Sequence, residues 1–177
     1  MLFRLGSSDL KYLITACSPA VDKRGIKPAL GMIACGISKD GWLTGLSTDG
    51  YRIHSVTIPC SMIKGEPESI ILLPIVKVPP KSKWVFIEIL ENEVIYGFDC
   101  LDDKQSIKID DSEFPDVIRY LPKDAPLFTI YVNPKFVLDA FKMFKDLETV
   151  KIEFYGEVSP ITVRWNEDYA FVLPKSQ

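Results

Sequence analysis

The sequence predicts an α+β protein made of three copies of one βαβββ repeat, in which a strand, a helix and three further strands follow one another. Three observations support this prediction. Short apolar or alternating runs are separated by polar turn residues, as is typical of strands. Clear helical periodicity occurs twice, each time directly after the first strand of a repeat. The order of elements returns about every 55–60 residues, which indicates an internal repeat.

The first repeat begins with a predicted strand over residues 2–5 and a helix that ends before Pro19. Ser7 or Ser8 can cap this helix. Its apolar face follows helical spacing through Leu10, Leu13, Ile14 and Cys17. The remaining strands of the repeat are predicted over residues 32–38, 43–46 and 51–59.

The last two of these strands are joined by Thr48, Asp49 and Gly50. Gly50 tolerates a positive φ angle and Asp49 can hydrogen-bond to its own backbone, so the pair predicts a hairpin turn. By itself the motif indicates only a turn. It gains weight from further motifs that follow in order, at residues 113–122, 132–140, 158–161 and 171–174.

The second repeat has the same order, with its helix almost lost. Residues 61–68 are predicted to be a polar connection and residues 69–73 a strand. Pro74, Pro79 and Pro80 leave room for about one helical turn. The remaining strands are predicted over residues 84–90, 93–98 and 104–109.

The third repeat begins with a predicted strand over residues 127–132. Asn133 is a typical N-cap, and Pro134 takes the first helical position, where proline is well tolerated. Val137, Phe141 and Phe144 share the apolar face of this helix, and strands follow over residues 150–155, 161–165 and 169–173. We therefore divide the chain into a two-repeat domain over residues 1–124 and a half-domain over residues 125–177.

The composition favours a chain with a sizeable core and without a strongly basic surface. Hydrophobic residues make up 47% of the chain and the net charge is −3, so contact with DNA would need a local basic face. No apolar run reaches membrane-spanning length, and the N-terminal apolar stretch is too short for a signal peptide, so we expect a cytoplasmic protein. The widely spaced cysteines are expected to be free buried thiols: Cys17, Cys35, Cys60 and Cys100.

Few residues are candidates for catalysis or metal binding. His54, the single histidine, lies on a predicted strand, and no serine or cysteine nucleophile accompanies it in a recognisable motif, which favours a structural role. Acidic runs at residues 99–103 and 110–113 could bind a divalent cation, but solvated turn residues are the favoured interpretation. We therefore predict neither an enzyme nor a cofactor-binding protein.

The ordered motifs resemble the bacterial DNA polymerase III beta subunit, the sliding-clamp family. Residues 47–53 stand where that family has Ala-Thr-Asp-Gly-His-Arg-Leu, and residues 113–122 are similar to the motif that closes its middle domain. Residues 2–122 resemble that middle domain, and residues 127–174 resemble only the second half of the last domain. The resemblance implies a DNA-clamp (processivity-factor) fold. The family's first domain and the first half of its last domain, which meet across its dimer interface, have no counterpart here.

The resemblance also implies two binding surfaces. In the family an apolar pocket receives peptide tails of polymerases, and the matching peptide-binding residues here are Leu30, Thr48, Gly50, Tyr51, Arg52, Ile53, Pro122, Val158, Phe171 and Leu173. The alternative is that these are core residues, which could suffice for Ile53 and Val158. Helices that line the family's central hole face DNA, and the matching DNA-binding lysines are Lys11, Lys135 and Lys142. Lysines populate the solvent face of any helix, however, and Asp139 and Asp146 interleave with them here.

Two functions agree with these features. The first is a DNA polymerase processivity factor that encircles or contacts double-stranded DNA without reading its sequence and binds polymerase peptide tails. The second is a clamp-like peptide-docking adaptor or decoy that does not encircle DNA. In either case we expect a homo-oligomer, because a half-domain leaves a helix face and a sheet edge uncovered. The simplest closure pairs two third repeats across a two-fold axis.

Overall fold

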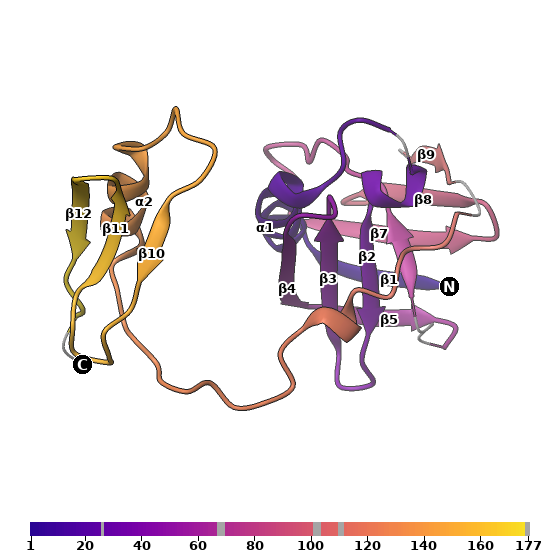
Figure 1. Cartoon of the computed structure of the whole chain (residues 1–177). Helices are drawn as coiled ribbons and strands as arrows, with labels where there is room; N and C mark the ends of the chain where they lie inside the picture. The colour runs from indigo at the N-terminus through magenta and orange to yellow at the C-terminus, as the bar shows by residue number, and fades with distance from the viewer. Residues whose placement is uncertain (26, 67–69, 101–103, 110–111, 176–177) are drawn as a thin grey trace. The chain divides into compact units, whose positions relative to one another are not determined.

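The computed structural model describes residues 1–25, 27–66, 70–100, 104–109 and 112–175 (Figure 1). The chain forms two compact units, Met1–Leu121 and Pro122–Gln177, here called the N-terminal and C-terminal units. The N-terminal unit holds two antiparallel sheets and the helix α1 (Ser7–Cys17), and the C-terminal unit holds one sheet and the helix α2 (Pro134–Lys142). Among all the residues that the structure describes, no helix has the length and apolar character that a membrane crossing needs.

One sheet of the N-terminal unit has the strand order β4-β3-β2-β6. Its strands are β2 (Ile33–Ile37), β3 (Trp42–Thr48), β4 (Ile53–Pro59) and β6 (Ile71–Leu73). The β3–β4 register pairs Thr48 with Ile53, so the predicted hairpin turn lies at residues 49–52. β6 is the first strand of the second repeat, but it pairs with β2 of the first repeat.

The other sheet has the order β5-β1-β7-β8-β9. Its strands are β1 (Leu2–Gly6), β5 (Ser61–Lys64), β7 (Trp84–Leu90), β8 (Glu93–Phe98) and β9 (Lys104–Lys108). β1 is the first strand of the first repeat and pairs with β7 of the second. Each repeat therefore contributes its first strand to the sheet of the other, which joins the two repeats into one unit.

Two details of the N-terminal unit differ from the sequence prediction. Residues 61–64 form β5 instead of a connection, because β1 offers them a free edge with which they pair antiparallel. The N-cap of α1 is Gly6, and no side chain caps the helix. Ser7 is already helical and its hydroxyl oxygen lies 2.5 Å from that of Ser82, so it is engaged elsewhere. Residues 74–83, where the prolines leave room for about one helical turn, form no helix, and short 3-10 turns occur at Ser18–Ala20, Pro28–Gly31 and Ile118–Tyr120.

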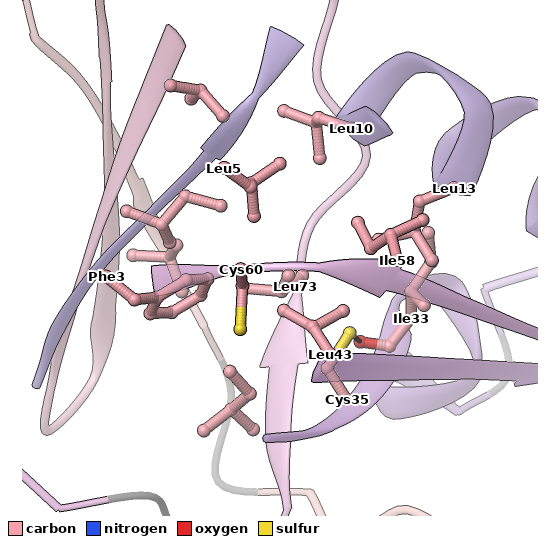
Figure 2. Packing of buried hydrophobic residues seen from close by; sticks show 14 of the residues in the cluster. Phe3, Leu5, Leu10, Leu13, Ile33, Cys35, Leu43, Ile58, Cys60 and Leu73 are labelled. Carbon is pink, nitrogen blue, oxygen red and sulfur yellow. Dashed lines mark hydrogen bonds between the residues drawn. The ribbon is translucent and has the colours of Figure 1, made fainter. Parts of the chain in front are cut away.

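The core of the N-terminal unit lies between α1 and both sheets. Figure 2 shows Leu10 and Leu13 of α1 among side chains from strands of the two sheets, such as Leu5 and Ile58. The eighteen buried residues of this cluster include Cys17, Cys35 and Cys60. Cys100 is exposed, so the prediction of a buried thiol is wrong for that residue. It lies in the bend that follows the end of β8.

The C-terminal unit is a three-stranded antiparallel sheet, in the order β10-β11-β12, with α2 packed on it. The strands are β10 (Lys151–Glu153), β11 (Ile161–Trp165) and β12 (Asp168–Val172). The side chain of Asn133 accepts a hydrogen bond from Lys135 N at 3.0 Å, which confirms the predicted cap of α2. Its core cluster contains only five buried residues, Ala140, Phe144, Ile161, Val163 and Val172.

The strand predicted over residues 127–132 does not form. Among the described residues, one backbone hydrogen bond joins this segment to the strands' side of the unit, from Lys175 N to Tyr131 O at 2.7 Å. In the N-terminal unit the first strand of a repeat pairs with the sheet of another repeat. The C-terminal unit contains a single repeat, so this segment lacks the sheet with which it would form a ladder.

Candidate functional site

The β3–β4 turn is held by hydrogen bonds from its own side chains. Asp49 Oδ1 accepts from the backbone N–H of Tyr51 at 3.1 Å and of Arg52 at 3.2 Å. Thr48 Oγ1 accepts from Gly50 N at 3.1 Å, and Gly50 has a φ angle of 91°, which favours glycine. These contacts confirm the predicted turn and leave the Tyr51 side chain 88% exposed.

The base of the turn is anchored to the C-terminal end of α1. Buried Ser47 donates from its hydroxyl to Cys17 O at 2.8 Å. His54 Nδ1 lies 2.7 Å from Ala16 O. The last carbonyl groups of a helix lack partners within the helix, so these two side chains satisfy them and fix the turn against α1. This position agrees with a structural role for His54.

Charged side chains surround the turn and line a pocket of about 290 Å³. Arg24 Nε lies 2.9 Å from Asp22 Oδ1, and Arg52 Nε lies 2.9 Å from Asp49 Oδ2. The hydrogen bond from Arg24 lowers the pKa of Asp22, and the N–H of Tyr51 lowers the pKa of Asp49. The pocket lining consists of Pro19, Val21, Asp22, Lys23, Arg24, Asp49, Tyr51 and Arg52.

Sequence reasoning missed Asp22 and Arg24 as neighbours of the turn. Locally, residues 23–28 show only that basic side chains gather there, at Lys23, Arg24 and Lys27, and residue 26 is outside the described residues. In the structure Asp22 N donates to Leu30 O at 2.9 Å, which closes this loop beside the 3-10 turn that carries Leu30. Thr48 is buried and Leu30 and Ile53 are half-buried, whereas Gly50 and Arg52 are exposed. Tyr51 is therefore the most accessible apolar group among these six predicted residues.

The predicted residues of the C-terminal unit are all exposed. Val158 is 88%, Phe171 60% and Leu173 70% exposed, and Pro122 is also exposed. The rings of Phe171 and Tyr169 are 5.1 Å apart between centroids. Positions two apart share one face of a strand, so Tyr169, Phe171 and Leu173, which directly follows β12, form one apolar row. Tyr169 was missed in the sequence, although its spacing from Phe171 could have revealed it.

These predicted residues form two separate sets. Six belong to the N-terminal unit, and Pro122, Val158, Phe171 and Leu173 belong to the C-terminal unit. The exposure of the second set excludes them from the small core of their own unit. Each set is therefore a surface of its own unit.

The three predicted DNA-binding lysines are exposed on the two helices. Lys11 lies on α1, and Lys135 and Lys142 lie on α2. Lys142 Nζ is 2.7 Å from Asp139 Oδ1, and both side chains are more than 60% exposed. An exposed pair of this kind contributes little to stability and leaves the lysine free to exchange partners.

Acidic residues do not form a metal site in the described part of the chain, where no group of three or more His, Cys, Asp or Glu side chains could hold an ion. Asp99 instead stabilises a turn, since its Oδ1 accepts from Lys83 N at 2.7 Å and Trp84 N at 3.0 Å. The N–H of Trp84 is the main cause of its lowered pKa. Of the other predicted acidic positions, Glu113 is exposed, and Asp102, Asp103, Asp110 and Asp111 lie outside the described residues.

The two sheets with exchanged first strands, α1 beside them, and the separate α2 unit define a DNA-clamp fold of the α+β class. The fold is that of the DNA polymerase III beta subunit. The chain is similar to the DNA polymerase sliding clamp from Pseudomonas aeruginosa with ligand, at 16% identity and a TM-score of 0.79, over 100% of this chain and 52% of that chain. It is also similar to a putative DNA polymerase III beta subunit from Eubacterium rectale, at 14% identity and a TM-score of 0.78, over 98% of this chain and 50% of that chain.

A third similar structure is the Pseudomonas aeruginosa sliding clamp bound to griselimycin, at 16% identity and a TM-score of 0.77, over 99% of this chain and 51% of that chain. The chain therefore spans about half the length of these clamps. No protein-family model and no curated protein matches the sequence. At these identities the likeness shows the fold.

Proposed function

We propose that this chain is a clamp-like DNA polymerase processivity factor of the cytoplasm, which binds short apolar peptide tails, contacts DNA and performs no catalysis. One observation carries the proposal. Apolar side chains are exposed at positions that match the peptide pocket of the clamp family, on a chain with a clamp fold along its whole length. Exposed apolar groups that the cores of their units do not use are available to a partner.

Each unit offers apolar groups to such a peptide. Tyr51, held out by the β3–β4 turn, is exposed on the N-terminal unit, and Phe171 and Leu173 are exposed on the C-terminal unit. Apolar grooves of this kind hold a peptide through one or two buried anchor side chains. A short peptide rich in Leu and Phe fits this chemistry best, because both units expose aromatic or aliphatic groups at the predicted positions.

Fluorescence anisotropy with a labelled peptide rich in Leu and Phe tests the site. Leu173→Asp places an unpaired charge in the groove, at a cost of several kcal/mol, so its affinity should fall by about 100-fold or more. Tyr51→Ala should also weaken binding, since it removes the exposed apolar group of the N-terminal unit. Met143→Asp is the matched control, because Met143 is 56% exposed after α2, outside the proposed groove.

If the unmodified protein does not bind the peptide with a dissociation constant below the millimolar range, the proposed site is wrong. Equal loss of binding in Leu173→Asp and Met143→Asp would also count against it, because any added charge would then act alike. A loss in Leu173→Asp with none in Tyr51→Ala would restrict the site to the C-terminal unit.

DNA contact is the second part of the proposed function. Lys11, Lys135 and Lys142 are exposed and can neutralise phosphates, so binding should be independent of sequence and fall steeply with salt. Changing all three to Glu should abolish retention on circular double-stranded DNA. The same change at exposed Lys39, Lys64 and Lys108 keeps the net charge equal and should preserve retention. Equal behaviour of the two triple variants would mean that these helix lysines only face solvent.

The exposed apolar residues within each unit also suit one alternative, a peptide-docking adaptor or decoy that does not encircle DNA. Peptide binding is common to both functions. Retention on closed circular DNA, lost when the circle is cut, is expected of a ring alone. Peptide binding without any such retention would favour the adaptor.

A further inference from the structure

The segment 127–132 of the C-terminal unit lacks a ladder, but its last four residues alternate in burial as a strand does. Thr129 and Tyr131 are exposed, whereas Ile130 and Val132 are partly buried against the small core. β1 shows the same alternation, with Phe3 and Leu5 buried. Both segments lead directly into the N-cap of a helix, at Gly6 for α1 and at Asn133 for α2. Residues 127–132 therefore occupy the place of a first strand.

One edge of this segment is already supported as in β1. β1 pairs on one side with β5, the segment that follows the last strand of its own repeat. Tyr131 O likewise accepts a hydrogen bond from Lys175 N, which follows β12, the last strand of its repeat. The other neighbour of β1 is β7, a strand of a different repeat. The counterpart of β7 is what the segment 127–132 lacks.

The missing neighbour can be identified from the pairings of the N-terminal unit. β7 and β2 are the first strands after the helix position of their repeats, and each pairs antiparallel with the first strand of the other repeat. In the C-terminal unit the corresponding strand is β10, which pairs with β11 alone and has an open edge. The unit thus has a first-strand segment without a ladder and an open edge on β10. In the N-terminal unit, these two kinds of element pair with each other only when they come from different repeats.

We propose that two copies of this chain associate through their C-terminal units by exchanging residues 127–132, each segment pairing antiparallel with β10 of the other copy. A second copy is the fitting partner because this unit carries both donor and acceptor, and a two-fold axis satisfies both at once. Self-association of this kind is independent of the peptide and DNA contacts proposed above.

Burial supports the same conclusion. The C-terminal unit has only five buried core residues, while Leu127 is 100%, Ile152 42% and Phe154 53% exposed beside the two unpaired edges. Open sheet edges with apolar neighbours are liabilities that proteins normally cover. Reciprocal pairing covers both edges and enlarges a core that is small for a folded unit.

Light scattering on the full chain at about 1 to 200 µM measures the assembly. We expect the mass to approach twice 20.0 kDa as the concentration rises. A mass that stays at one chain at about 200 µM overturns the proposal, since a pairing that weak would not hold the copies together.

Proline variants test which edge is used. In an extended segment the N–H and C=O of one residue point to the same side, and those of the next residue to the other. Tyr131 O faces Lys175, so Thr129 shares that side, whereas Phe128 and Ile130 face the open side. Phe128→Pro removes a donor from the open edge of both copies and should raise the dimer dissociation constant by about tenfold or more.

Two controls accompany this variant. Thr129→Pro removes a donor on the other side, and Phe128→Ala removes the ring, 6.3 Å from that of Phe154, without removing a donor. Both should stay within about threefold of the unmodified dimer. A dimer that Phe128→Pro leaves intact, or that Thr129→Pro weakens equally, uses another surface, and the exchange is then wrong.

Hydrogen exchange on the unmodified protein decides the case if Phe128→Pro does not fold. Raising the concentration over the same range should slow exchange in peptides that cover residues 127–132 and 150–155. Exchange there that does not depend on concentration, or slowing confined to other segments, overturns strand exchange.

Discussion

At the residue scale, Asp49 is the side chain on which the β3–β4 turn depends. It accepts two backbone N–H groups and pairs with Arg52, so one carboxylate sets the path of four residues. Tyr51 is exposed because of this path. The turn is in turn anchored to α1 through Ser47, whose hydroxyl binds Cys17 O. Asp49, which is not one of the predicted peptide-binding residues, therefore positions Tyr51, which is one of them.

Asp49→Asn should be less stable than the unmodified protein at neutral pH, and the difference should shrink on acidification. Hydrogen bonds from the N–H of Tyr51, and then from Arg52, lower the pKa of Asp49 from 3.8 in the folded protein. Its contribution is therefore complete above the unfolded pKa and is lost as pH falls through the folded pKa. Urea unfolding of both proteins between about pH 6 and pH 3 measures this. A difference that is constant over the range would contradict it.

At the element scale, the packing of α1 on β3 depends on Gly45. A Cβ atom at Gly45 would lie 2.5 Å from Leu13 Cδ1 and 3.0 Å from Ile33 Cγ2. Both side chains are fully buried, so neither can move into solvent. Glycine at this strand position lets the helix lie close to the sheet, and the helix end then reaches Ser47 and His54.

Gly45→Ala should lower the free energy of unfolding by about 1–3 kcal/mol through overpacking. Leu13→Val shortens the side chain that the new methyl group meets. The double variant should lose less unfolding free energy than the sum of the losses in the two single variants, because the smaller side chain relieves the clash. Urea unfolding of the four proteins of this cycle provides the measurement. Strict additivity would show that Leu13 does not limit this position.

At the scale of the whole molecule, the two units differ in how much core they hold. The N-terminal cluster has eighteen buried residues and the C-terminal cluster five. A small core leaves little free energy against the conformational entropy of the chain. The C-terminal unit should therefore unfold first, unless a second copy covers it.

Tryptophan fluorescence can follow each unit separately. Trp165 lies in the C-terminal unit, and Trp42 and Trp84 lie in the N-terminal unit. The variant that keeps only Trp165 should unfold at a lower urea concentration than Trp165→Phe. Its midpoint alone should rise with protein concentration, because association stabilises the state that associates. Coincident midpoints at every concentration would mean that the two units unfold as one.

Local features of the fold and site were predictable from sequence because neighbouring residues decide them. The turn at Thr48, Asp49 and Gly50 and the cap at Asn133 both depend on hydrogen bonds within three residues. Within the strand predicted over residues 127–132, burial alternates only from residue 129 to residue 132. The exposed positions Phe171 and Leu173 follow from the period of a strand. In each case the pattern is short and the partner is near.

Pairing between distant segments was decided only by the tertiary structure. β5 looked like a polar connection and became a strand because β1, some sixty residues earlier in sequence, offers it an edge. Residues 127–132 looked like a strand and form no ladder because their unit contains one repeat. Asp22 and Arg24 reach the turn at Asp49 because loops from different elements meet at the end of α1. A ladder needs a partner strand as well as a strand sequence, and where that partner lies is a property of the folded chain.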